Sequence, residues 1–227
     1  MKTKTLEDNL FILHFSCLGD WEKVTEGGPW HFRGNAVLFA PYDGFTKPSM
    51  IELNTLDMWI QIHDLPIGYS SMIKALSSKV GKFVSLELPS NNFAGNFFRV
   101  RVTIDVRYPL KNHVSLSRAG KREIFIVKYE KLPTWCSVCG MLGHTYKEHG
   151  DGIHAPSALV FRNLRAPGII VREAVQVVEE VGAVDVMEAL AVVETEMTLE
   201  TNTSMQLWIP RTQRMRILRW MMYKETV

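Results

Sequence analysis

The sequence predicts an α+β fold, in which a small antiparallel or mixed sheet with two short helices is followed by a compact Cys/His segment and a helical C-terminal tail. Over residues 9–131, short apolar runs alternate with two helical patterns. Residues 132–150 bring together two cysteines and two histidines. Residues 151–227 form an acidic stretch rich in valine and alanine, with a helix over about residues 172–200, and end in a basic segment. We therefore expect three domains with these boundaries.

The expected strands are short apolar or alternating runs bounded by turn residues. They cover residues 10–15, 36–40, 58–63, 83–88, 97–106 and 123–129, with Pro41 ending the second. Residues 97–106 show the strictest alternation of apolar and polar side chains, so this strand should have one buried face and one solvated face. The order strand, helix, strand, strand from Trp59 to Val106 is compatible with a ferredoxin-like or RNA-recognition-like half.

Two short helices are expected between these strands. Asp20 is a candidate cap for a helix over about residues 20–25, which a Gly-Gly-Pro turn follows. Ser70 or Ser71 is a candidate cap for the second helix, over residues 72–80. The apolar positions of this second helix fall on one face, which predicts that it packs against the sheet.

Composition and charge exclude some classes of protein. The chain has 227 residues and a formal charge of only +2, so its overall charge indicates no particular partner. It has no run of about 18 or more apolar residues, which predicts no membrane-spanning helix, and its N-terminus lacks the apolar core of a secretory signal. Two of the three cysteines lie close together beside histidines, which favours a metal site in a reducing compartment over a disulfide. Cys17 is expected to be a small core residue.

The Cys/His segment carries four candidate metal ligands within fourteen residues. They are Cys136, Cys139, His144 and His149, spaced Cys-x2-Cys-x4-His-x4-His. Thiolate and imidazole ligands suit Zn²⁺, which takes four ligands in a tetrahedron. Because protein side chains fill all four positions, none remains open for water or substrate, and the site is predicted to be structural rather than catalytic.

Two glycines and a third histidine bear on this site. Gly140 and Gly143 supply the backbone freedom that lets the chain fold back between the second cysteine and the first histidine. His154 is an alternative to His149 as the fourth ligand. A plainer interpretation is that the histidines are ordinary surface residues beside a buried pair of cysteines.

These residues resemble a known motif. The run Cys136-x2-Cys139-Gly140-x2-Gly143-His144 is similar to the CCHC zinc knuckle of retroviral nucleocapsid and retrotransposon Gag-like proteins. Upstream, an ordered series of pieces resembles a plant domain of unknown function found in retrotransposon-derived Gag-like proteins. The pieces are residues 26–30, 59–66, 98–105, 109–110 and 128–133.

The resemblance covers about residues 9–150 and implies zinc binding, nucleic-acid binding and a place in the nucleus or cytoplasm. Two departures from the family pattern matter. The last ligand of the family is Cys, where this chain has His149. The family domain also has a further helix and strand before the point where this chain starts, so this copy is expected to be truncated.

A local surplus of basic residues lies next to the zinc knuckle. Residues 97–131 contain nine basic and three acidic side chains. The candidate nucleic-acid-binding residues are Arg99, Arg101, Arg107, Lys128 and Lys131 for phosphates, and Trp135 and Tyr146 for stacking on unpaired bases. The alternative is a solvated polar strand face, with the aromatic side chains packed into the domain.

Together these features predict a non-enzymatic, zinc-dependent protein that binds single-stranded RNA or DNA with low sequence specificity. The alternative is a protein-interaction or assembly module, in which the zinc knuckle is only a structural staple and the Val-rich helix mediates self-association. The sequence shows no phosphate-binding glycine loop and no carboxylate cluster at a strand end. Turn or cap roles explain Asp64, Asp105 and His63 better than catalysis does.

Overall fold

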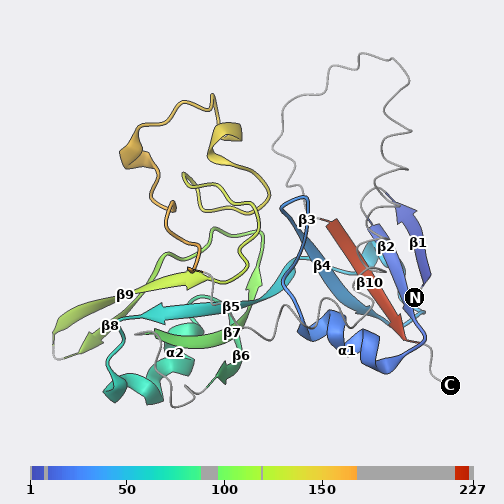
Figure 1. Ribbon diagram of the computed structural model, residues 1–227, viewed down its shortest axis with the longest axis horizontal. Coiled ribbons are helices and arrows are strands. Elements are labelled where there is room, and N and C mark those ends of the chain that lie inside the picture. Colours follow the sequence, from blue (N-terminus) through green and yellow to red (C-terminus); the bar gives the residue numbers. More distant parts are fainter. Residues whose placement is uncertain (1, 8–9, 88–96, 119, 168–217, 225–227) are drawn as a thin grey trace.

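Two sheets form the frame of the molecule. The computed structural model describes residues 2–7, 10–87, 97–118, 120–167 and 218–224. Within these residues the strand orders are β1-β2-β10-β4-β3 in the first sheet and β6-β7-β5-β9-β8 in the second, and the two sheets lie side by side (Figure 1). The fold mixes strands with few helices, as predicted, but it has two sheets where one was expected.

The first sheet combines strands from both ends of the chain. Its members are β1 (Lys2–Glu7), β2 (Leu10–Phe15), β3 (Trp30–Phe32), β4 (Asn35–Tyr42) and β10 (Leu218–Lys224). β10 runs parallel to β2 on one side and to β4 on the other, so it is the central strand. The expected helical tail is not supported, since residues 218–224 form a strand and residues 172–200 lie outside the described residues.

The second sheet is antiparallel throughout. Its members are β5 (Thr55–His63), β6 (Lys82–Glu87), β7 (Phe97–Asp105), β8 (His113–Arg118) and β9 (Lys121–Tyr129). β5 pairs along its whole length with β7, in a register that runs from Thr55 opposite Asp105 to His63 opposite Phe97. The alternation in β7 is as expected, because Val100, Val102 and Ile104 are buried while their neighbours are half-buried.

All six expected strands are present, and four strands were not predicted. β1 and β3 have no strong apolar or alternating run of their own, whereas β8 alternates polar and apolar residues and β10 contains an apolar run, although neither was predicted as a strand. Each of the four pairs with a predicted strand. β4 also continues past Pro41. Because β3 pairs only with residues 35–37, Pro41 lies where β4 has a neighbour on one side only, and a missing N–H is tolerated there.

Both expected helices form, with different ends. α1 (Leu18–Glu26) begins after Cys17, which is exposed and makes no side-chain cap, so the expectation of a core cysteine is wrong. Asp20 lies in the first turn of α1 rather than at its cap. α2 (Ile73–Ser77) is shorter than expected mainly because it ends three residues early, in a turn over residues 78–80, and the predicted serine caps lie in the preceding 3₁₀ turn (Ile67–Met72). Two further 3₁₀ turns cover Pro48–Met50 and Pro156–Ala158.

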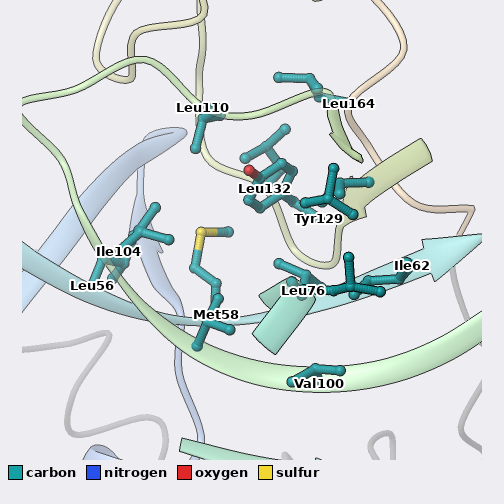
Figure 2. Packing of buried hydrophobic residues seen from close by; sticks show 14 of the residues in the cluster. Leu56, Met58, Ile62, Leu76, Val100, Ile104, Leu110, Tyr129, Leu132 and Leu164 are labelled. Atoms are coloured by element: carbon teal, nitrogen blue, oxygen red, sulfur yellow. The ribbon is translucent and has the colours of Figure 1, made fainter. Parts of the chain in front are cut away.

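The main hydrophobic core joins the second sheet to the Cys/His segment. Figure 2 shows Met58 of β5, Leu76 of α2 and Leu132, the first residue of the Cys/His segment, together in this core. Leu142 from inside that segment and Leu164 from beyond it are buried in the same cluster. The Cys/His segment is therefore built onto the sheet through shared apolar contacts, which stabilise its position by the burial of several leucines.

Candidate metal centre

A tight turn holds the two cysteines of the candidate site. The Gly140 N–H donates to the Cys136 carbonyl at 2.9 Å, and the Cys136 N–H donates to the Met141 carbonyl at 2.8 Å. Gly140 has a φ of +75°, and a Cβ added there would lie 3.0 Å from the Phe161 ring. Glycine is therefore required at this position both by the left-handed backbone and by the close packing of Phe161.

A short 3₁₀ turn, η3 (Tyr146–Glu148), separates the two histidines. The Glu148 carboxylate accepts from the Thr145 N–H at 2.8 Å, and the Thr145 side chain accepts in return from the Glu148 N–H, which forms a capping box. The Thr145 hydroxyl also donates to the Glu148 carboxylate at 3.0 Å. The His149 N–H then donates to the Tyr146 carbonyl at 3.3 Å. This local network turns the chain so that His149 comes back beside His144.

The four predicted ligands come together in one cluster. The donor atoms of Cys136, Cys139, His144 and His149 all lie within 4.8 Å of one another. Cys139 Sγ and His144 Nε2 are 3.5 Å apart, which matches the separation of about 3.5 Å that bond lengths of about 2.3 and 2.0 Å give in a tetrahedral zinc site. The rings of His144 and His149 stack with centroids 5.8 Å apart.

An unpaired buried atom supports the fit of a metal ion to this cluster. His149 Nδ1 is buried and has no hydrogen-bond partner among the described residues. A buried polar atom without a partner is costly, and a bound cation beside the ring would offset that cost by fixing its orientation. The soft thiolates and the two imidazoles together form a donor set that suits zinc.

Burial in the cluster favours the neutral forms of the Cys139 thiol and the His144 imidazole. Burial raises the pKa of the Cys139 thiol, and the neighbouring Cys136 sulfur raises it further. Burial likewise lowers the pKa of His144, and the nearby His149 lowers it further. The neutral imidazole is the form that ligates a metal, and a divalent cation would reverse the preference of the thiols and favour their thiolates.

His154 takes a supporting position rather than a ligand position. Its Nε2 lies 2.9 Å from the His149 carbonyl oxygen, and its ring lies 5.4 Å from the His149 ring. The group of four that can hold an ion contains His149 and not His154. The structure thus favours His149 as the fourth ligand, with His154 packed behind it.

Three contacts fasten the Cys/His segment to the rest of the chain. The Leu110 N–H donates to the Gly140 carbonyl at 2.9 Å, and the Thr134 N–H donates to the Gly34 carbonyl at 2.7 Å. The Phe161 N–H donates to the Ser137 carbonyl at 2.9 Å. Phe161 was not singled out in the sequence, since an isolated aromatic residue in a loop carries no periodic signal.

The two arginines of β7 are occupied by carboxylates. Arg99 lies over the Trp59 ring at 4.0 Å from its centroid and pairs with Glu130 at 2.8 Å and with Glu87. Arg101 pairs with Asp57 at 3.3 Å and donates to a carbonyl of α1. The polar face of this strand, which was expected to be solvated, is therefore largely covered by ion pairs. The carboxylates neutralise both guanidinium groups, which weakens their attraction for phosphates.

The remaining predicted contact residues differ in their exposure to solvent, and one of them is bound by a carboxylate. Arg107 is exposed, and it donates two hydrogen bonds to Asp105 that hold the pKa of that carboxyl below its ordinary value. Lys128 is half-buried on β9, and Lys131 is exposed. Of the two predicted aromatics, only Tyr146 of η3 is exposed.

Trp135 is committed to internal contacts. Its Nε1–H donates to the Phe161 carbonyl at 2.9 Å, and the Arg165 guanidinium covers its ring at 5.0 Å from the centroid. The ring also packs against the main core. The plainer interpretation of this tryptophan, as an aromatic side chain packed into the domain, fits these contacts best.

The fold and the ligand cluster together define a closed Cys/His metal module built onto a β-sheet. Residues 104–149 match a protein-family model described as Zinc knuckle, so the chain carries a CCHC-type knuckle in this range. The matched range begins at the end of β7 and includes β8, β9 and all four ligands. No curated protein and no solved structure matches the chain. Each helix in the described residues is too short or too polar to cross a bilayer.

Proposed function

We propose that this protein binds single-stranded RNA or DNA, with low sequence specificity, through a zinc-loaded knuckle. The observation that carries the proposal is the convergence of Cys136, Cys139, His144 and His149 inside a segment that matches the zinc knuckle family. Zinc knuckles are among the modules that recognise unpaired bases. Bound zinc would tie the turn that carries the cysteines to the segment that carries the histidines.

The surface of the knuckle suits a sequence-tolerant contact. Tyr146 and Lys147 are both exposed on η3, between the two histidine ligands. A tyrosine ring can stack on any base, and a lysine beside it can neutralise a phosphate. Because Lys131 is exposed while the two β7 arginines are paired, the lysines rather than the arginines are the phosphate contacts in this proposal.

A Gag-like role belongs to the same proposal. The ordered sequence pieces over residues 26–133, which run directly into the knuckle, support this role and a source in plant retrotransposons. The role is non-catalytic, since four protein ligands fill a tetrahedral ion and leave no position for a substrate or an activated water.

Fluorescence anisotropy with labelled single strands of RNA and DNA tests this function. We expect the zinc-loaded chain to bind both, with an affinity that falls as salt rises and is lost on chelation. Cys139→Ser should weaken binding by about tenfold or more, because it removes a ligand. Cys17→Ser, which changes an exposed cysteine outside the cluster, should bind like the unmodified chain. Binding that ignores both chelator and Cys139→Ser would refute the mechanism.

A second candidate is an assembly module in which the knuckle is a structural staple. It is favoured by the inward packing of the knuckle through Leu142, and by two isoleucines on β9, Ile124 and Ile126, that are 60% and 50% exposed. Such paired apolar side chains suit a protein contact. Sedimentation of the zinc-loaded chain separates the candidates, because a mass that rises with concentration in a chain without nucleic-acid affinity would support assembly.

A further inference from the structure

A basic hollow lies beside the knuckle, on the edge of the second sheet. It has a volume of about 840 Å³ and is formed by the turn between α2 and β6 together with the loop between β7 and β8. The lining residues that matter here are Lys79, Lys82, Tyr108, Lys111, His113 and Phe161. Three lysines, a histidine and an exposed tyrosine thus line one concave surface.

The charge of this hollow is not balanced from within the described part of the chain. Lys82 and Lys111 form no ion pair there, and the Lys79 ammonium donates to the neutral carbonyl of Ser115. Asp105 is the carboxylate of the lining, and Arg107 already binds it through Nε at 2.9 Å and NH2 at 2.6 Å. The hollow therefore presents a net positive potential to solvent.

The wall of the hollow is held rigidly and is tied to the knuckle. The Lys111 N–H donates to the Tyr129 hydroxyl at 3.0 Å, and that hydroxyl donates to the Lys111 carbonyl at 2.9 Å. Tyr129 is fully buried, which raises the pKa of its hydroxyl and keeps it a hydrogen-bond donor. The neighbouring residue, Leu110, donates its N–H to Gly140 of the knuckle at 2.9 Å. The wall is therefore bonded directly to the turn of the knuckle that carries Gly140.

We propose that the hollow carries the phosphate backbone of the same single strand that contacts the knuckle. The inference rests on the proposed nucleic-acid function and adds a second contact surface outside the zinc site. Lys79, Lys82 and Lys111 contact successive phosphates, and Tyr108, which is 65% exposed, stacks on a base. A single strand fits this combination, because its unpaired bases expose the faces that tyrosine needs.

Two triple variants of the full zinc-loaded chain test this proposal against a labelled oligothymidine of about 12 nucleotides. The test variant carries Lys79→Gln, Lys82→Gln and Lys111→Gln. The control carries Lys4→Gln, Lys23→Gln and Lys47→Gln, which remove the same charge from exposed positions on the first-sheet side. The test variant should bind about tenfold more weakly than the unmodified chain. The slope of log K against log salt should become less steep by about 2, because each lost phosphate contact removes about 0.7 from its magnitude. The control should keep the slope of the unmodified chain.

A pair of aromatic variants tests the stacking contact. Tyr108→Ala should weaken binding severalfold at an unchanged salt slope, because stacking releases no counterions. Phe45→Ala, at a position that is 94% exposed in the first-sheet region, should have no effect. Thermal unfolding of every variant checks that each remains folded.

The possible results separate this proposal from the zinc function. If the unmodified chain binds in a chelator-sensitive way but the test and control triples behave alike, the hollow is not a contact surface and the zinc function stands. If the unmodified chain binds no single strand at all, both proposals fail. Weaker binding of the test triple with a reduced salt slope would support the hollow.

Discussion

At the level of single side chains, His149 and His154 differ in what their rings contact. His149 joins the cysteines and His144, and its Nδ1 is buried without a partner among the described residues. His154 uses its Nε2 on the carbonyl of His149, 2.9 Å away. One histidine is placed to bind the ion and the other to hold the first in position.

Separate alanine variants of these histidines should show the difference. His149→Ala should weaken zinc affinity by about a hundredfold or more, because it removes a ligand, while His154→Ala should cost about tenfold or less, as a residue that orients a ligand does. Competition with a chromophoric chelator measures both, and cobalt substitution reports whether the tetrahedral geometry persists. Equal losses in the two variants, or a larger loss in His154→Ala, would contradict this assignment.

At the level of elements, the first sheet depends on a strand from the far end of the chain. β10 lies between β2 and β4 and pairs with both, so its removal would leave two strands without their shared neighbour. Met221 and Met222 of β10 are buried, and they pack with β2 and with residues around Leu53. The sheet is therefore continuous only when β10 pairs with both of its neighbours.

A buried charge in β10 should unfold the first sheet. We expect Met221→Asp to lower the free energy of unfolding by about 3 kcal/mol or more, because it places an unpaired carboxylate in an apolar cluster. Arg219→Ser, at an exposed position of the same strand, is the control. Hydrogen exchange measures the effect locally, and residues 10–15 and 35–42 should lose protection first. A variant with unchanged exchange in these strands would show that β10 does not hold the sheet.

At the level of the whole molecule, three buried or half-buried histidines couple folding to pH. Burial is the largest cause that lowers the pKa of His31, His63 and His144, with help from Lys128 at His63 and from His149 at His144. As the pH falls, a histidine whose pKa is lowered by folding is protonated in the unfolded chain at a higher pH than in the folded chain. Stability is therefore unaffected well above the ordinary histidine pKa of about 6.5 and falls as the pH drops below it.

Denaturant unfolding of the zinc-free chain between about pH 7.5 and 5 checks this coupling. The free energy of unfolding should decrease across the lower part of that range, where the unfolded chain binds more protons. His63→Gln should make the decrease shallower, and His113→Gln, at an exposed position, serves as the matched control. Stability that is flat or rises on acidification would contradict the burial argument.

The arginines of β7 show why the predicted contact surface needed the tertiary structure. The alternating sequence indicates that Arg99 and Arg101 share a polar face, and they do. Glu130, which binds Arg99, lies 31 residues away, and Asp57, which binds Arg101, lies 44 residues away. A local basic surplus therefore does not reveal which charges are free, because partners distant in sequence neutralise some of them.

The sequence alone predicted the two helices, six of the strands and the group of four candidate metal ligands that the structure brings together. Each of these depends on local spacing: a closed ligand set within fourteen residues, a turn-forming glycine, or an apolar period along one strand. Only the tertiary structure decided that the chain makes two sheets, that β10 is the centre of one, and that lysines from separate elements gather at a hollow beside the knuckle. These features arise from contacts between segments far apart in the chain, and no local pattern encodes such contacts.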